Sequence, residues 1–124
     1  EVSCGCITLD GLPKSIGVTE IVPANEFFDF ESKYSHHQTE EITPARIEKG
    51  VYSEVEKLTE NIYQWLHCKG MIRVDYMICD DGIYLIEVNT TPGLSEASIV
   101  PRQAIYSGYT LREFFQMSVI ESLR

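Results

Sequence analysis

Residues 71–93 read MIRVDYMICDDGIYLIEVNTTPG, in which two runs of alternating side chains flank the turn Asp80-Asp81-Gly82. Strict alternation on both sides of a glycine-containing turn predicts a β-hairpin. One face of this hairpin is expected to pack on a core, and it carries Ile72, Val74, Tyr76, Ile78, Tyr84, Ile86 and Val88. The other face carries Arg73, Asp75, Glu87 and Asn89 among Met77 and Leu85.

The length of the turn decides which of these side chains meet. A three-residue loop with Gly82 in the left-handed conformation gives the cross-strand pairs Cys79 with Ile83, Asp75 with Glu87, and Arg73 with Asn89. A two-residue loop would send the two carboxylates to opposite faces and leave Glu87 on the apolar face without a partner, which is costly. We therefore expect the three-residue loop.

Two opposed carboxylates repel each other unless a cation lies between them. Asp75, Glu87 and Asn89 offer only oxygen ligands, the set suited to Mg²⁺, which takes one or two carboxylates and leaves other positions to water and phosphates. The other interpretation is a solvated face on which Arg73 pairs with one of the acids, since exposed ion pairs are common and contribute little. The hairpin residues alone leave both interpretations open.

Composition excludes several classes of protein. The chain of 124 residues is expected to form one domain, and it has 10 Lys and Arg against 19 Asp and Glu, a net charge of −9 that argues against a nucleic-acid partner. The sequence predicts no membrane span. The spacing of the four cysteines matches no zinc or disulfide framework, so we expect reduced, mostly packed thiols and a cytoplasmic protein. The start at Glu1, without Met or a leader, suggests a piece of a longer polypeptide.

The first part of the chain predicts further strands. Strands are expected at residues 1–9, 16–22 and 27–31, with a turn over residues 10–13 closing the first hairpin. Residues 31–41 lose all periodicity and are expected to form a polar loop.

Helices are expected elsewhere. The sequence predicts a helix over residues 44–69, capped by Thr43 and ended by Gly70. Its apolar stripe is expected to pack on the sheet and consists of Ile47, Val51, Val55, Leu58, Ile62, Trp65 and Leu66. A short helix is expected over 102–107, and a last helix opens at a capping box, Thr110 to Glu113. Its core candidates are Leu111, Phe114, Phe115, Val119 and Leu123.

Four segments together resemble the C-terminal part of D-alanine–D-alanine ligase, an ATP-grasp enzyme. They are Glu20-Ile21-Val22-Pro23, Phe27-Phe28-Asp29-Phe30-Glu31-Ser32-Lys33-Tyr34-Ser35, Gly70-Met71-Ile72-Arg73-Val74-Asp75, and Glu87-Val88-Asn89-Thr90-Thr91-Pro92-Gly93-Leu94. The resemblance implies an α+β fold for residues 1–124: the C-terminal lobe of an ATP-grasp unit, a mainly antiparallel sheet of four to six strands packed against helices. The N-terminal domain and most of the central nucleotide-binding domain would then lie outside this chain.

The resemblance also implies a reaction. The full-length enzyme would join two D-alanines through an acyl phosphate, with ATP and two Mg²⁺ ions (Mn²⁺ being an alternative), in the synthesis of peptidoglycan precursors. It would be a cytoplasmic homodimer without nucleic-acid or membrane partners. This chain alone is expected to be inactive.

By resemblance, the metal ligands are Asp75, Glu87 and Asn89. Arg73 and the backbone N–H of Gly93 would stabilise the oxyanion, which fits the need to neutralise developing charge. Ser98 and the backbone of Ile99 would bind the carboxylate of the second D-alanine.

The resemblance assigns four more residues to the nucleotide and to site closure. Lys33 would meet phosphate, Tyr34 would join a hydrogen-bond network that closes the site, Phe27 would contact adenine and Glu1 would bind ribose. Relatives that make D-alanine–D-lactate commonly have Phe where Tyr34 stands, so Tyr34 favours the dipeptide. The alternatives are another ATP-grasp carboxylate–amine or D-lactate ligase, or a non-catalytic acidic module that binds a partner protein.

Overall fold

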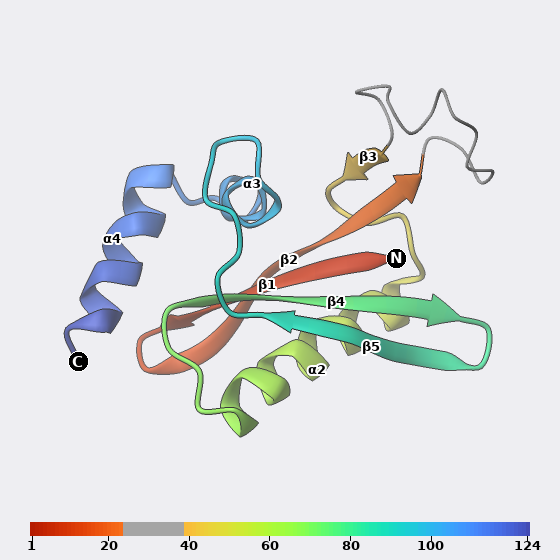
Figure 1. The fold of residues 1–124 in the computed structure, drawn as a ribbon, viewed down its shortest axis with the longest axis horizontal. Coiled ribbons are helices and arrows are strands. Elements are labelled where there is room, and N and C mark those ends of the chain that lie inside the picture. The colour runs from red at the N-terminus through yellow and green to blue at the C-terminus, as the bar shows by residue number, and fades with distance from the viewer. Residues whose placement is uncertain (24–38) are drawn as a thin grey trace.

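A computed structural model of the chain describes residues 1–23 and 39–124. In these residues the core is a five-stranded sheet in which every neighbouring pair is antiparallel, with the order β3-β2-β1-β4-β5 (Figure 1). The strands are β1 (Val2–Leu9), β2 (Leu12–Pro23), β3 (Thr39–Ile42), β4 (Met71–Cys79) and β5 (Gly82–Asn89). The expected α+β fold with an antiparallel sheet is confirmed.

The first hairpin follows the sequence closely. Its turn residues, Asp10 and Gly11, both have positive φ angles, 53° and 79°. Two such residues form the kind of turn whose twist matches that of the flanking strands, and Gly adopts it at no steric cost. The expected strands over residues 1–9 and 16–22 are therefore confirmed as one hairpin, β1 with β2. The expected turn over residues 10–13 is too long, because β2 already begins at Leu12.

The helices cover both faces of the sheet. Helix α2 (Lys49–Trp65) lies along one face, and α3 (Ile99–Tyr106) and α4 (Leu111–Ser122) lie against the other (Figure 1). Under α2 the core includes Cys4, Val74 and Tyr76, all fully buried. The second core, under α3 and α4, contains Ile7, Ile16, Val100, Ala104 and Phe114.

The predicted start of the long helix at residue 44 is wrong, because residues 43–46 are tied to β2. The Thr43 hydroxyl is hydrogen bonded to the Thr19 hydroxyl at 2.6 Å, and the Ala45 N–H donates to the carbonyl of Val18 at 2.8 Å. Thr43 therefore does not cap the helix, which begins at Lys49 instead.

The predicted end of this helix is also wrong. His67 adopts a positive φ of 53°, and the backbone N–H groups of His67 and Cys68 donate to the carbonyls of Gln64 and Tyr63. This pair of bonds is a Schellman motif, which ends a helix at its left-handed residue. The chain thus leaves the helix before Gly70, and Trp65 and Leu66, predicted to be core, are 66% and 57% exposed.

The last helix is confirmed at its start and wrong toward its end. Thr110 and Glu113 form both bonds of the capping box, and Phe114 is fully buried. Val119 and Leu123, predicted to be core, are exposed. Helix α3 begins at Ile99, earlier than the predicted residue 102.

Two further expectations concern β3 and the cysteines. Residues 39–41, expected to be loop, belong to β3, while the predicted strand at 27–31 lies outside the described residues. All four cysteines are free thiols, and Cys4 and Cys6 are fully buried as expected. Burial raises the pKa of Cys6 to about 12. Across residues 1–23 and 39–124, no helix combines the length and the apolar character needed to cross a membrane.

Candidate active site

The β4–β5 hairpin brings its polar residues together in the predicted pairs. Asp75 lies opposite Glu87, and Arg73 lies opposite Asn89. The turn, however, has two residues, Asp80 and Asp81, and Cys79 pairs with Gly82, so the predicted three-residue loop is wrong.

A β-bulge restores the register of the acidic residues. Tyr76 pairs with Leu85 while Asp75 pairs with Glu87, so Ile86 is one extra residue on β5. A bulge of this kind shifts every later pair by one position, which moves Glu87 from the apolar face to the face of Asp75. On the turn side of the bulge, the two-residue turn corrects the predicted core: Ile83 packs against it, whereas Tyr84 is 51% exposed. Ile86, the extra residue of the bulge, is 48% exposed.

The acidic pair belongs to a polar row that crosses four strands. Thr19 on β2 is paired with Ser3 on β1, Ser3 with Asp75 on β4, and Asp75 with Glu87 on β5. Paired residues share a face of a sheet, so all four lie on the face opposite α2. The next row across the same strands contains Gly17, Gly5, Arg73 and Asn89.

Asp75 is a nearly buried carboxylate, 4% exposed, held by two neighbours. The Arg73 guanidinium donates from Nε to Oδ1 at 2.9 Å and from Nη2 to Oδ2 at 3.0 Å. The Ser3 hydroxyl donates to Oδ1 at 2.7 Å. The hydrogen bond with Asp75 raises the pKa of Arg73, and a bidentate pair of this kind fixes both side chains.

The Arg73 guanidinium therefore lies close to two carboxylates, those of Asp75 and Glu87. Nη2 of Arg73 also lies 4.0 Å from Glu87 Oε1. The Thr91 N–H donates a hydrogen bond to Asn89 Oδ1 at 3.0 Å, which fixes the Asn89 side-chain amide at the end of the hairpin. Asp75, Glu87 and Asn89 share one face of the hairpin and offer only oxygen atoms, the donor chemistry that suits Mg²⁺.

The segment after β5 is folded compactly against itself. A Cβ on Gly93 would lie 2.9 Å from Ser98 Oγ, so a side chain here would displace the Ser98 hydroxyl. The Ser98 hydroxyl is 2.7 Å from that of Ser95 and makes no capping bond to the helix that follows. The structure thus brings Gly93 and Ser98 together, with Ile99 as the first residue of α3.

Of the remaining predicted site residues, only Glu1 lies among the residues that the structure describes. Glu1 is exposed immediately before β1, and its charge contributes to the raised pKa of Arg73, which places it near the polar row. Phe27, Lys33 and Tyr34 lie outside the described residues.

Three residues of this site were missed in the sequence, namely Ser3, Thr19 and Gln103. On β1, the small or polar residues Ser3 and Gly5 alternate with Cys4 and Cys6. That alternation indicates a strand with one polar face and could have pointed to Ser3. Nothing local marks Gln103, because its partners lie about a hundred positions earlier in the chain.

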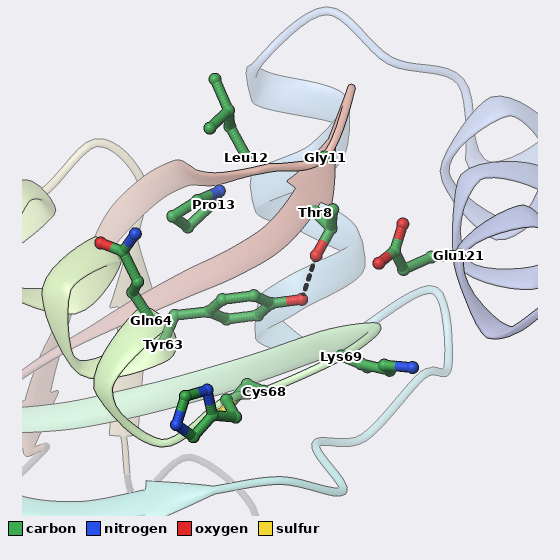
Figure 2. A pocket seen from close by; sticks show the side chains of 10 residues that line it. Thr8, Gly11, Leu12, Pro13, Tyr63, Gln64, Cys68, Lys69 and Glu121 are labelled. Atoms are coloured by element: carbon green, nitrogen blue, oxygen red, sulfur yellow. Dashed lines mark hydrogen bonds between the residues drawn. The ribbon is translucent and has the colours of Figure 1, made fainter. Parts of the chain in front are cut away.

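A separate pocket of about 290 Å³ lies between the β1–β2 turn, the end of α2 and α4 (Figure 2). In Figure 2 the Tyr63 hydroxyl points toward that of Thr8, to which it is hydrogen bonded, and Lys69 and Glu121 lie on the far side. None of the predicted site residues lines this pocket. The polar row lies elsewhere: Ser3, Thr19 and Asp75 are buried, and only Glu87 at its end is exposed.

Comparisons with known proteins agree with these observations. The family model described as D-ala D-ala ligase C-terminus matches residues 1–120. The D-alanine–D-alanine ligase of Azobacteroides pseudotrichonymphae genomovar. CFP2 is 42% identical over 124 residues, which cover 99% of this chain and 38% of the relative.

Solved structures show the same fold. The Bacillus anthracis D-alanine–D-alanine ligase complexed with ATP has a TM-score of 0.76 and 32% identity, over 99% of this chain and 39% of that one. VanG D-Ala:D-Ser ligase from Enterococcus faecalis has a TM-score of 0.76 and 26% identity, over 95% and 34%. The present chain thus spans under two fifths of the length of the relatives it matches.

Proposed function

This chain belongs to the D-ala D-ala ligase C-terminus family, and from that premise we propose that the full-length protein joins two D-alanines while converting ATP to ADP and phosphate. The observation that carries the proposal is the pair of carboxylates, Asp75 and Glu87, placed opposite each other around the guanidinium of Arg73. A solvated ion pair would be exposed, whereas Asp75 is 4% exposed and accepts hydrogen bonds from Ser3 and Arg73.

In the first step, a carboxylate oxygen of one D-alanine attacks the γ-phosphorus of ATP, and the bond from that phosphorus to ADP breaks. Asp75, Glu87 and Asn89 would hold two Mg²⁺ ions, with Mn²⁺ as the alternative. When bound, the ions neutralise charge on the phosphates and polarise the transferred group. The chain's own task in this step is to hold the three oxygen ligands in a fixed array.

In the second step, the amine of the other D-alanine attacks the acyl carbon, and phosphate leaves. Negative charge develops on the carbonyl oxygen, and Arg73 with the backbone N–H of Gly93 would stabilise it. The acceptor's carboxylate would bind the Ser98 hydroxyl and the Ile99 N–H at the start of α3, where a helix favours negative charge.

The proposal includes roles for the other residues implied by the family. Lys33 would contact phosphate, Tyr34 would help to close the site, Phe27 would contact adenine, and Glu1 would bind ribose. The full-length protein is proposed to act in the cytoplasm as a homodimer. This chain alone is expected to release no phosphate, since it spans only 38% of its relatives.

The test is ADP release by the full-length protein with ATP, Mg²⁺ and D-alanine, compared between wild type and Glu87→Gln. Loss of one metal-binding charge is expected to lower the rate by about 100-fold or more. Glu54→Gln is the matched control, because Glu54 is exposed on α2 on the opposite face. ADP release that does not depend on D-alanine, or an unchanged Glu87→Gln, would contradict the proposal.

A second candidate function is ligation of a different acceptor. The fold is shared with an enzyme named D-Ala:D-Ser ligase, so the sheet does not select the acceptor. Tyr34 favours an amine acceptor over D-lactate and does not separate D-alanine from D-serine. An acceptor panel of D-alanine, D-serine and D-lactate separates these reactions. If instead the protein is a non-catalytic acidic module, ATP and Mg²⁺ will leave its thermal stability unchanged.

A further inference from the structure

A fully buried glutamine on α3 joins that helix to the middle of the sheet. The side-chain oxygen of Gln103 accepts a hydrogen bond from the Gly5 N–H at 2.9 Å. Its nitrogen donates to the Ser3 carbonyl at 2.9 Å and to the Thr19 hydroxyl at 2.9 Å. One side chain therefore holds α3 to both β1 and β2.

The sheet is shaped to receive this side chain. A Cβ on Gly5 would lie 2.5 Å from Gln103 Oε1, so only glycine allows the contact. The register of β1 and β2 also shifts between Gly5 and Cys6. Such shifts leave backbone groups without their usual ladder partners, and Gln103 provides partners for two backbone groups at this place.

The same contacts continue to the acidic pair. Ser3, whose carbonyl accepts from Gln103, donates its hydroxyl to Asp75, and Asp75 holds Arg73. Ser3 and Asp75 are 2% and 4% exposed. Buried hydrogen-bond networks that are fully satisfied hold their members rigidly, so Gln103, Ser3, Asp75 and Arg73 form one continuous network.

The segment from Gly93 to Ile99 leads into the N-terminal end of α3. Figure 1 shows this segment leaving β5 and crossing to α3. Ser98 immediately precedes the helix and contacts Gly93. Gln103 is five residues beyond Ser98, about 7 Å along the helix axis, so a fixed Gln103 fixes the start of α3.

We propose that Gln103 is a positioning residue, which holds Ser98 and Ile99 in place relative to Asp75 and Arg73 through its bonds to β1 and β2. The inference rests on the proposed function, in which Ser98 and Ile99 bind the second D-alanine. Its amine must meet an acyl carbon beside Arg73, and a misplacement of about 1 Å can cost a hundredfold in rate. Gln103 therefore aligns the acceptor with the acyl phosphate.

The first test is Gln103→Met in the full-length protein, since Met has a similar length and lacks the three hydrogen bonds. The KM for the second D-alanine is expected to rise about tenfold, while the KM for ATP changes less than about twofold. Amide hydrogen exchange in residues 93–99 should become faster, with α2 unchanged. Gln116→Met is the control, because Gln116 is an exposed glutamine on α4.

Gly5→Ala tests the same contact from the sheet, because the added methyl group displaces Gln103 Oε1. Gly5→Ala should likewise raise the KM for the second D-alanine while the KM for ATP stays nearly unchanged. The inference is overturned if exchange in residues 93–99 is unchanged in both variants, if all kinetic constants shift equally, or if both variants unfold. If wild type forms no ADP with D-alanine, the proposed function fails, whereas hydrogen exchange still decides whether Gln103 positions residues 93–99.

Discussion

The face of the sheet under α2 and the face under α3 are built from alternate residues of the same strands, yet they differ in chemistry. Under α2, β1 and β4 contribute Cys4 and Val74, which are fully buried in an apolar core. On the other face the same strands contribute Ser3, Gly5 and Asp75, which are hydrogen bonded. One face stabilises the fold by apolar burial, while the other keeps polar groups in fixed positions.

Fixed polar groups are compatible with burial only when each has a partner. In residues 1–23 and 39–124, every buried side-chain nitrogen or oxygen has a hydrogen-bond partner. A satisfied polar network has little penalty, whereas removing one member leaves another unpaired. Mutations on the two faces should therefore differ in kind, with loss of activity on the α3 face and loss of stability on the α2 face.

The largest effect is expected for Asp75→Asn on the polar face. The variant keeps the shape of the side chain and removes a proposed metal ligand, so ADP release by the full-length protein should fall by about 100- to 1000-fold. The thermal midpoint should fall as well, because Arg73 loses its buried charged partner. Asp80→Asn, in the exposed turn of the same hairpin, is the control. Equal activity of the two variants would contradict the division between the faces.

The neighbouring residue on the apolar face should behave in the opposite way. Val74 is fully buried under α2, so Val74→Ala should lower the free energy of unfolding by about 2 kcal/mol, through lost apolar contact and a cavity. Urea denaturation measures the change. The KM values for ATP and D-alanine should stay unchanged. A selective change in either KM would show that the two faces are not independent.

The apolar face should also make the fold sensitive to alkali. Burial raises the pKa of Cys6 from 9.0 to about 12, so between these values the folded protein binds more protons than the unfolded chain. The free energy of unfolding should therefore fall as pH rises above 9, by up to about 1.4 kcal/mol per pH unit. Urea denaturation at pH 8 and pH 10 should show a smaller loss for Cys6→Ala. Cys79→Ala, at an exposed thiol, should behave as wild type.

The smallest effect is expected for Ser3→Ala. Asp75 keeps its bidentate pair with Arg73 and loses only one hydrogen bond, so the Mg²⁺ concentration for half-maximal activity should rise about threefold. Ser15→Ala is the matched control. Ser15, on β2, is buried like Ser3, but its hydroxyl donates to Glu56 and Glu60 of α2 and not to Asp75. A larger magnesium effect in the control would reverse the comparison.

The pairing of Asp75 with Glu87 could be predicted from residue type, because the alternative register leaves a carboxylate in an apolar layer. The combination of turn length and bulge that produces this pairing could not be predicted. A turn shorter by one residue and an extra residue at Ile86 have opposite effects on the register, and alternation alone does not distinguish this combination from a longer turn.

The ends of α2 show how tertiary contacts override local signals. Thr43 followed by proline is a favourable helix start, but its hydroxyl bonds to Thr19 on β2 instead. At the other end, His67 takes the left-handed conformation before the chain reaches Gly70. Both differences depend on where the helix must meet the sheet.

The sequence by itself determined the family, the alternation that separates the two faces, and the oxygen chemistry of Asp75, Glu87 and Asn89. These are properties of residue type and of short-range periodicity. Only the tertiary structure decided that β1 lies between β2 and β4, that Ser3 meets Asp75, and that Gln103 reaches Gly5. Such contacts join residues far apart in the chain, and strand order and register place them together. The polar row is therefore a product of the whole sheet.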